Sequence, residues 1–253
     1  MPFASAAGRA IAYEWIDAAP GKPVLVFLHE GLGSIGQWRG FPQKVAKATG
    51  LPALVYDRYG YGESDVLQEK QRTVRFMHDE GLLSLPALLR ELRIEKPILV
   101  GHSDGASIAL IHAGAGHPVR GVVAMAPHVF IEPQCLTSIV KAKQAFEETD
   151  FAARLGKYHR VARKTFYGWA DVWLDPDFKG WDIRDEYLRA IRCPVLAIQG
   201  YDDEYGTMAQ LDELAARAAD CELVKLEKCG HAPFRDQPEK TLAAAVSFIK
   251  KLP

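Results

Sequence analysis

The chain has 253 residues, 48% of them hydrophobic, enough to fill the core of one large α/β domain or two small ones; we expect one. A net charge of −1 with 25% charged residues gives no overall field that would attract nucleic acid or an anionic membrane, so a small-molecule partner is favoured. The first residues lack a basic stretch followed by an apolar one, and no apolar run approaches the roughly 20 residues that span a bilayer, so a soluble, cytoplasmic protein is expected.

Two short apolar runs between residues 3 and 16 flank Ala7-Gly8-Arg9 and predict a hairpin. Continuous apolar runs typical of strands buried on both faces of a parallel sheet then recur at residues 24–28, 53–56, 98–100, 119–125, 195–198 and 223–226. Helical patterns separate them at residues 37–48, 74–92, 106–115, 208–219 and 238–250. This alternation predicts a mostly parallel, doubly wound α/β sheet that binds ligands beyond the carboxyl ends of its strands.

Residues 128–189 interrupt the alternation with helical spacing and many large aromatic side chains. We interpret them as an inserted helical cap, which leaves residues 1–127 and 190–253 as the core domain. Trp169 and Trp173 are four positions apart and share one helical face. Such rings either pack the cap onto the sheet or, with Leu32, line a substrate pocket.

The four cysteines are scattered without a CxxC pair, and a chain of this size needs no disulfides, so we expect free thiols: Cys135, Cys193, Cys221 and Cys229. Cys229 precedes a histidine by two residues, but no second cysteine or histidine follows at ligand spacing. We therefore expect neither a metal site nor a cofactor.

The segment 97–106 is an apolar strand pattern that runs through Gly101-His102-Ser103-Asp104-Gly105 into small helix-forming residues. This order places Ser103 on a sharp strand-to-helix turn, and a side chain at either glycine would crowd that turn. Ser103 is the candidate nucleophile, and a serine hydroxyl needs an adjacent base that a third group orients.

His231 is the candidate base because it follows the last strand pattern and precedes the C-terminal helix. The other histidines lack such a position, except His29, which precedes a glycine loop with another role. The acid is expected after the strand at residues 195–198, where three carboxylates are adjacent. Asp203 is favoured, Asp202 is the alternative, and Glu204 is expected to face solvent.

Acyl transfer also needs N–H donors for the oxyanion of the tetrahedral intermediate. One donor is expected to be the amide of Asp104, which follows the nucleophile. The second is expected from the glycine-rich loop 29–34, where Gly31 is favoured and Leu32 is the alternative.

The chain order Ser103, Asp203, His231 on alternating strands and helices resembles the α/β-hydrolase superfamily. The loop at His29, the turn 57–64 and the Gly-His-x-Pro sequence at His231 support the resemblance, which runs almost from end to end. In this family the turn 57–64 is structural, and we assign it no chemistry. One departure is Glu30, which takes the place of a glycine found in many relatives, and a carboxylate there opposes an oxyanion unless it is paired or points away.

The resemblance implies a serine hydrolase that cleaves an ester-type bond through an acyl-enzyme, and a carboxylesterase is favoured. A nucleophilic serine distinguishes the chain from relatives with an aspartate nucleophile, such as haloalkane dehalogenases. A thioesterase, a lactonase, a C–C bond hydrolase and a ligand-binding receptor with little turnover stay open. Seven lysines and arginines against three acids between residues 141 and 164 suggest either an anionic substrate or a solvated helix face.

Overall fold

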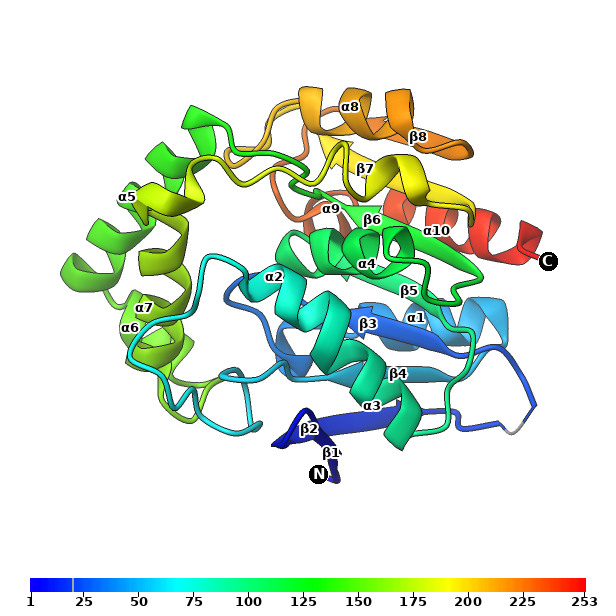
Figure 1. The fold of residues 1–253 in the computed structure, drawn as a ribbon, viewed down its shortest axis with the longest axis horizontal. Coiled ribbons are helices and arrows are strands. Elements are labelled where there is room, and N and C mark those ends of the chain that lie inside the picture. The colour runs from blue at the N-terminus through cyan, green and yellow to red at the C-terminus, as the bar shows by residue number, and fades with distance from the viewer. Residues whose placement is uncertain (20) are drawn as a thin grey trace.

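The structure is a computed structural model and describes residues 1–19 and 21–253. Its described part is built on an eight-stranded sheet in the order β1-β2-β4-β3-β5-β6-β7-β8 (Figure 1). The strands are β1 (Phe3–Ala6), β2 (Arg9–Ile16), β3 (Leu25–Leu28), β4 (Ala53–Tyr56), β5 (Ile98–His102), β6 (Gly121–Met125), β7 (Val195–Gly200) and β8 (Cys221–Leu226). The hairpin β1–β2 joins β4 antiparallel, and all other neighbours are parallel, as the alternating pattern predicts.

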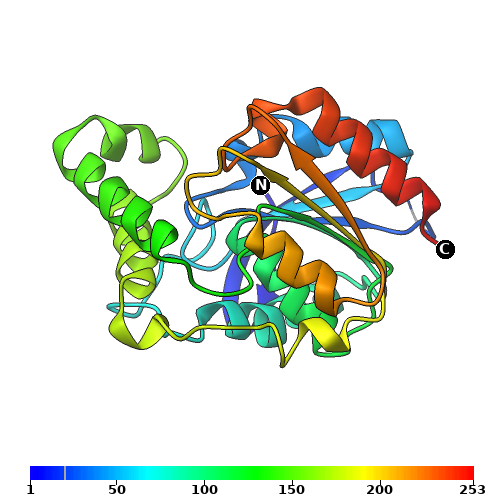
Figure 2. The same cartoon turned by 90° about the horizontal axis from the view of Figure 1, so that it is seen from above.

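The central strands β3 to β7 consist entirely of buried residues because helices cover both faces of the sheet. One face packs against α1 (Phe41–Thr49), α9 (Pro233–Asp236) and α10 (Pro238–Lys251). The other packs against α2 (Phe76–Asp79), α3 (Leu85–Glu91), α4 (Asp104–Gly114) and α8 (Ala209–Arg217). Figure 2 shows these two helical layers on opposite sides of the strands.

Two predicted helices differ from the structure. The predicted helix 37–48 is wrong at its start, because a 3₁₀ turn, η1 (Ile35–Trp38), ends where Arg39 and Gly40 adopt left-handed φ values of 50° and 81°, and α1 begins only after them. The predicted helix 74–92 is divided into α2 and α3 by a π-helical turn, η2 (Glu80–Ser84). The strand predicted over 119–125 begins at Gly121.

Residues 128–189 leave the sheet after β6 and return before β7. They contain α5 (Pro133–Glu148), α6 (Phe151–Leu155), α7 (Ala162–Trp173) and two 3₁₀ turns, η3 (Pro176–Phe178) and η4 (Leu188–Ala190). The three helices lie together at one end of the molecule in both views (Figures 1 and 2). Stacked rings of Phe146 and Phe166, 3.9 Å apart, join α5 to α7.

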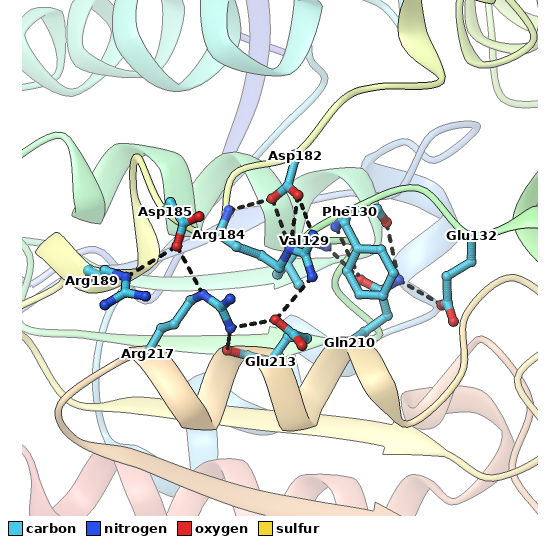
Figure 3. Close-up of polar contacts among 10 residues, drawn as sticks. All are labelled: Val129, Phe130, Glu132, Asp182, Arg184, Asp185, Arg189, Gln210, Glu213 and Arg217. Atoms are coloured by element: carbon cyan, nitrogen blue, oxygen red, sulfur yellow. Dashed lines mark hydrogen bonds and ion pairs between the residues drawn. The ribbon is translucent and has the colours of Figure 1, made fainter.

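Helix α8 contacts both ends of the segment 128–189 through hydrogen bonds and an ion pair (Figure 3). On the outgoing side, the buried Gln210 accepts from the Val129 N–H at 2.7 Å and donates to Glu132 Oε2 at 2.7 Å. On the returning side, Arg184 pairs with Asp182 on its own segment and with Glu213 on α8. The two crossing segments also touch each other through a β-bridge between Phe130 and Asp182.

All four cysteines are free thiols. Among the described residues, no helix combines the length and the apolar character needed to cross a membrane.

Candidate active site

Ser103 lies on the strained turn between β5 and α4, with φ 52° and ψ −121°. Both neighbouring glycines are sterically required. A Cβ on Gly101 would lie 2.4 Å from the Gly105 oxygen, and a Cβ on Gly105 would lie 2.1 Å from the Leu28 oxygen. The turn therefore forms only because neither position carries a side chain, as the sequence pattern predicts.

The structure brings together the three side chains selected from the sequence. His231 Nε2 lies 2.8 Å from Ser103 Oγ, and His231 Nδ1 lies 2.8 Å from Asp203 Oδ1 and 3.0 Å from Asp203 Oδ2. Of the three adjacent carboxylates, Asp203 faces the imidazole. Asp202 and Glu204 are exposed, although Glu204 Oε2 also accepts from the His231 N–H at 3.2 Å.

Electrostatics favour an ionised Asp203 beside a readily protonated imidazole. Burial raises the pKa of Asp203, but the charge of His231 and its hydrogen bond outweigh burial and bring that pKa below its usual value. Burial likewise opposes charging of His231, yet the charge of Asp203 and the same hydrogen bond raise the pKa of His231. The amide of Tyr205 donates to Asp203 Oδ1 at 2.8 Å and further stabilises the carboxylate.

The loop after β3 meets the first turn of α4 beside Ser103. In the part of the chain that the structure describes, the amides of Gly31, Leu32 and Asp104 donate to no backbone carbonyl. Trp169 of α7 closes over Gly31 so tightly that a Cβ there would lie 2.1 Å from Trp169 Nε1. Glycine at position 31 therefore lets α7 approach the loop.

A cavity of about 130 Å³ opens beside Ser103 Oγ. Cavities of about 150 Å³ bind one benzene molecule, so this cavity takes a group of about that size. The predicted pocket residues Leu32, Trp169 and Trp173 all line it. The remaining lining residues are Glu30, Gly31, Ser103, Asp104, His128, Cys135, Ile139, Tyr205 and His231.

Sequence reasoning missed His128 and Tyr205. His128 was set aside for lack of a strand-end position, but it follows β6 by three residues and therefore lies at the carboxyl edge of the sheet. Its ring lies 4.9 Å from Trp173, and burial lowers its pKa to about 3, so it is neutral. Tyr205, two residues after Asp203, places its ring 4.7 Å from that of His231.

A buried ionic cluster lies behind the cavity. Arg58 belongs to the turn 57–64, and its side chain donates to the Glu30 carbonyl at 3.0 Å. The same guanidinium lies 3.9 Å from the Asp104 carboxyl and contacts Glu80. Burial raises the pKa of the Asp104 carboxyl to about 6. Both oxygens of Asp104 lack a hydrogen-bond partner among the described residues.

The basic residues of segment 141–164 do not reach the cavity. Lys143 pairs with Asp171, and Arg163, whose side chain is 70% exposed, pairs with Glu147. Within the described ranges, no lysine or arginine lines the cavity, and no group of three or more potential ligands is placed to hold a metal ion.

The sequence profile described as "Alpha/beta hydrolase family" matches residues 25–245. Proline iminopeptidase of Lactobacillus helveticus is 30% identical, over 98% of this chain and 96% of that protein. Among solved structures, a carboxylesterase of Nitrososphaera gargenis superposes with a TM-score of 0.81 at 19% identity, covering 98% of this chain and 97% of the other. The enol-lactonase of Burkholderia xenovorans gives 0.78 at 21% identity, covering 99% and 100%.

Proposed function

Because the chain belongs to the alpha/beta hydrolase family, we propose that it is a serine hydrolase that cleaves esters of small acyl groups through Ser103, His231 and Asp203. The observation that carries the proposal is the unbroken hydrogen-bond sequence from Asp203 through His231 to Ser103 Oγ, at the mouth of a small cavity. Residues 128–189 act as the cap that closes this cavity.

In the first half-reaction His231 Nε2 takes the proton of Ser103 Oγ as the oxygen attacks the ester carbonyl carbon. The amides of Asp104 and of Gly31, with Leu32 as the alternative to Gly31, donate to the resulting oxyanion. Imidazolium then protonates the leaving alkoxide as the C–O bond breaks, which leaves an acyl-enzyme. Water deprotonated by His231 attacks the acyl carbon, and collapse releases the carboxylic acid and restores Ser103.

Asp203 acts through His231. Its carboxylate accepts from Nδ1–H, which leaves Nε2 free to take the serine proton, and it stabilises the imidazolium once formed. The aromatic walls, Trp169 and Trp173, exclude water from the acyl site. The cavity volume favours an acyl group of about the size of one benzene ring or smaller.

A second candidate is an aminopeptidase for a small N-terminal residue. It is favoured by the residues that line the cavity, which include the acidic Asp104 and, over the residues described, no lysine or arginine. A protonated amine would give the Asp104 carboxyl a hydrogen-bond donor in addition to the nearby charge of Arg58. The Lactobacillus relative supports this candidate by its name.

A fluorophosphonate probe and a substrate panel test the proposal. We expect the probe to label the wild-type protein and not Ser103→Ala, and we expect repeated turnover of p-nitrophenyl acetate with little turnover of p-nitrophenyl decanoate. The panel also contains a thioester, a lactone and L-prolyl p-nitroanilide, which reports the aminopeptidase candidate. Labelling without turnover of any substrate would favour a binding protein, and undiminished hydrolysis by Ser103→Ala would refute the triad.

A further inference from the structure

The carboxylate of Glu30 would oppose the charge of an oxyanion if it were free, but it is paired with two basic side chains. Its Oε2 lies 3.3 Å from His102 Nδ1, and its Oε1 lies 3.7 Å from Arg235 Nη2. Burial opposes ionisation, but the hydrogen bond with His102 and the charges of His102 and Arg235 lower the pKa of Glu30 to about 2. The carboxylate is therefore ionised at neutral pH, with its charge directed toward two basic groups.

The other nitrogen of His102 contacts the backbone of the candidate base. His102 Nε2 lies 2.7 Å from the carbonyl oxygen of His231, and because a carbonyl only accepts, Nε2 carries the hydrogen of this bond. The residue is 2% exposed, and the centroid of its ring lies 5.2 Å from that of Phe234 and 6.4 Å from that of Trp38. His102 therefore connects the loop after β3 to the loop that carries His231.

The backbone of His231 is held on both of its polar groups. His102 donates to its carbonyl, and its N–H donates to Glu204 Oε2. The neighbouring Gly230 N–H donates to Asp236 Oδ2 at 2.8 Å. With the backbone fixed, the hydrogen bond to Asp203 is sufficient to set the two side-chain torsions that aim Nε2 at Ser103.

We propose that Glu30 and His102 are a positioning pair that holds the imidazole of His231 within proton-transfer distance of Ser103 through the His231 carbonyl. The inference rests on the proposed function, because positioning matters only if His231 is the base. A displacement of about 1 Å costs a reaction of this kind on the order of 100-fold in rate. Such a displacement leaves Leu32, Trp169 and Trp173 in the cavity wall, so we expect substrate binding to be retained.

Two substitutions of His102 separate the role of the Nε2 donor from that of general packing. In His102→Gln the side-chain amide nitrogen can occupy the position of Nε2 and donate to the His231 carbonyl, whereas in His102→Asn it can occupy only that of Nδ1. We expect kcat for p-nitrophenyl acetate to fall about tenfold or more in His102→Asn, with KM within twofold of wild type. We expect His102→Gln, which keeps the donor to the His231 carbonyl but loses the contact with Glu30, to retain more of kcat than His102→Asn and about as much as Glu30→Gln.

Glu30→Gln tests the other member of the pair and stays informative if a His102 variant fails to fold. We expect Glu30→Gln to lower kcat more than it changes KM. In the double variant Glu30→Gln/His102→Asn, kcat should be no lower than in the worse single variant, because the two residues act as a unit. His117→Asn, at a partly exposed histidine beyond the C-terminal end of α4, is the control and should leave kcat unchanged.

The rate of Ser103 labelling by the fluorophosphonate is measured in parallel, with thermal unfolding to establish that each variant is folded. Slower labelling of a folded His102→Asn protein supports the inference. Equal kcat in His102→Asn and His102→Gln, or a change confined to KM, would overturn it. Failure of the wild-type protein to label at all would instead count against the proposed function, so the two failures are distinguishable.

Discussion

His231 Nε2 lies 2.8 Å from Ser103 Oγ, although the two residues are 128 positions apart in the chain. The contact arises because β5, which ends just before Ser103, and β8, which ends just before the His231 loop, are strands of one parallel series. Their carboxyl ends lie at the same edge of the sheet, so the loops that follow them meet there.

Asp203→Asn should lower kcat about 10³–10⁴-fold, because the amide no longer holds Nδ1–H and no longer stabilises imidazolium. Neutral His231 is the active form, so in the wild-type protein the rate rises with pH through a pKa above the usual value for histidine. The charge of Asp203 is the main cause that raises this pKa, so the rising limb of the pH–rate profile should move to lower pH in the variant. The exposed Asp202→Asn is the control, and an unmoved limb in Asp203→Asn would contradict the assignment.

Gly31→Ala should lower kcat/KM for p-nitrophenyl acetate at least about tenfold. The added Cβ would lie 2.1 Å from Trp169 Nε1, so either the ring leaves the cavity wall or the loop shifts its amides. Gly180→Ala is the matched control because a Cβ there meets no atom of the described chain within 4 Å. In the double variant Gly31→Ala/Trp169→Ala, part of the lost activity should return. Full activity of Gly31→Ala alone would show that the close contact between Trp169 and position 31 is not required.

Gln210→Leu should destabilise the protein by about 2–4 kcal/mol. The substitution keeps the side-chain volume but leaves the buried Val129 N–H without an acceptor, at a cost of about 1–3 kcal/mol. It also removes one hydrogen bond to Glu132, which contributes about 1 kcal/mol, while Thr207 still donates to that carboxylate. Arg189→Gln provides the comparison, because its ion pair with Asp185 is exposed and contributes at most about 1 kcal/mol. Urea unfolding measures the free energy of unfolding of both variants. Equal midpoints would show that the hydrogen bonds of Gln210 to the segment 128–189 do not stabilise the protein.

His112→Asn should make stability less dependent on pH. Burial lowers the pKa of His112 to about 4. In the folded protein the ring therefore stays neutral at pH values where the unfolded chain already binds a proton. The resulting stability, up to about 3 kcal/mol, is present above the ordinary histidine pKa and is lost as the pH falls toward 4. The asparagine amide can replace the Nδ1 bond to the Gly81 carbonyl without titrating. Thermal midpoints measured between pH 7 and 4.5 should fall less steeply in the variant, and parallel curves would refute the assignment.

The local features of the site could be predicted because each has a short-range cause. Gly101 and Gly105 flank Ser103, and a Cβ at either position would clash with backbone atoms of the same turn or of the adjacent strand β3. Apolar runs of strand length likewise predict buried parallel strands, because only such strands hide both faces. The break of the helix predicted over 37–48 was missed because Arg39, a residue with no turn preference, adopts a left-handed conformation there.

The sequence by itself determined which residue types stand at the carboxyl edge of the sheet: a serine at a forced turn, a histidine before the last helix and acids after a strand. Only the tertiary structure decided that Asp203 faces the imidazole, that His128 lines the cavity and that Glu30 is paired with His102. The physical reason is range. Backbone turns and strand burial follow from neighbours in the chain, whereas the direction of a side chain and the partner of a buried charge depend on segments that meet only after folding.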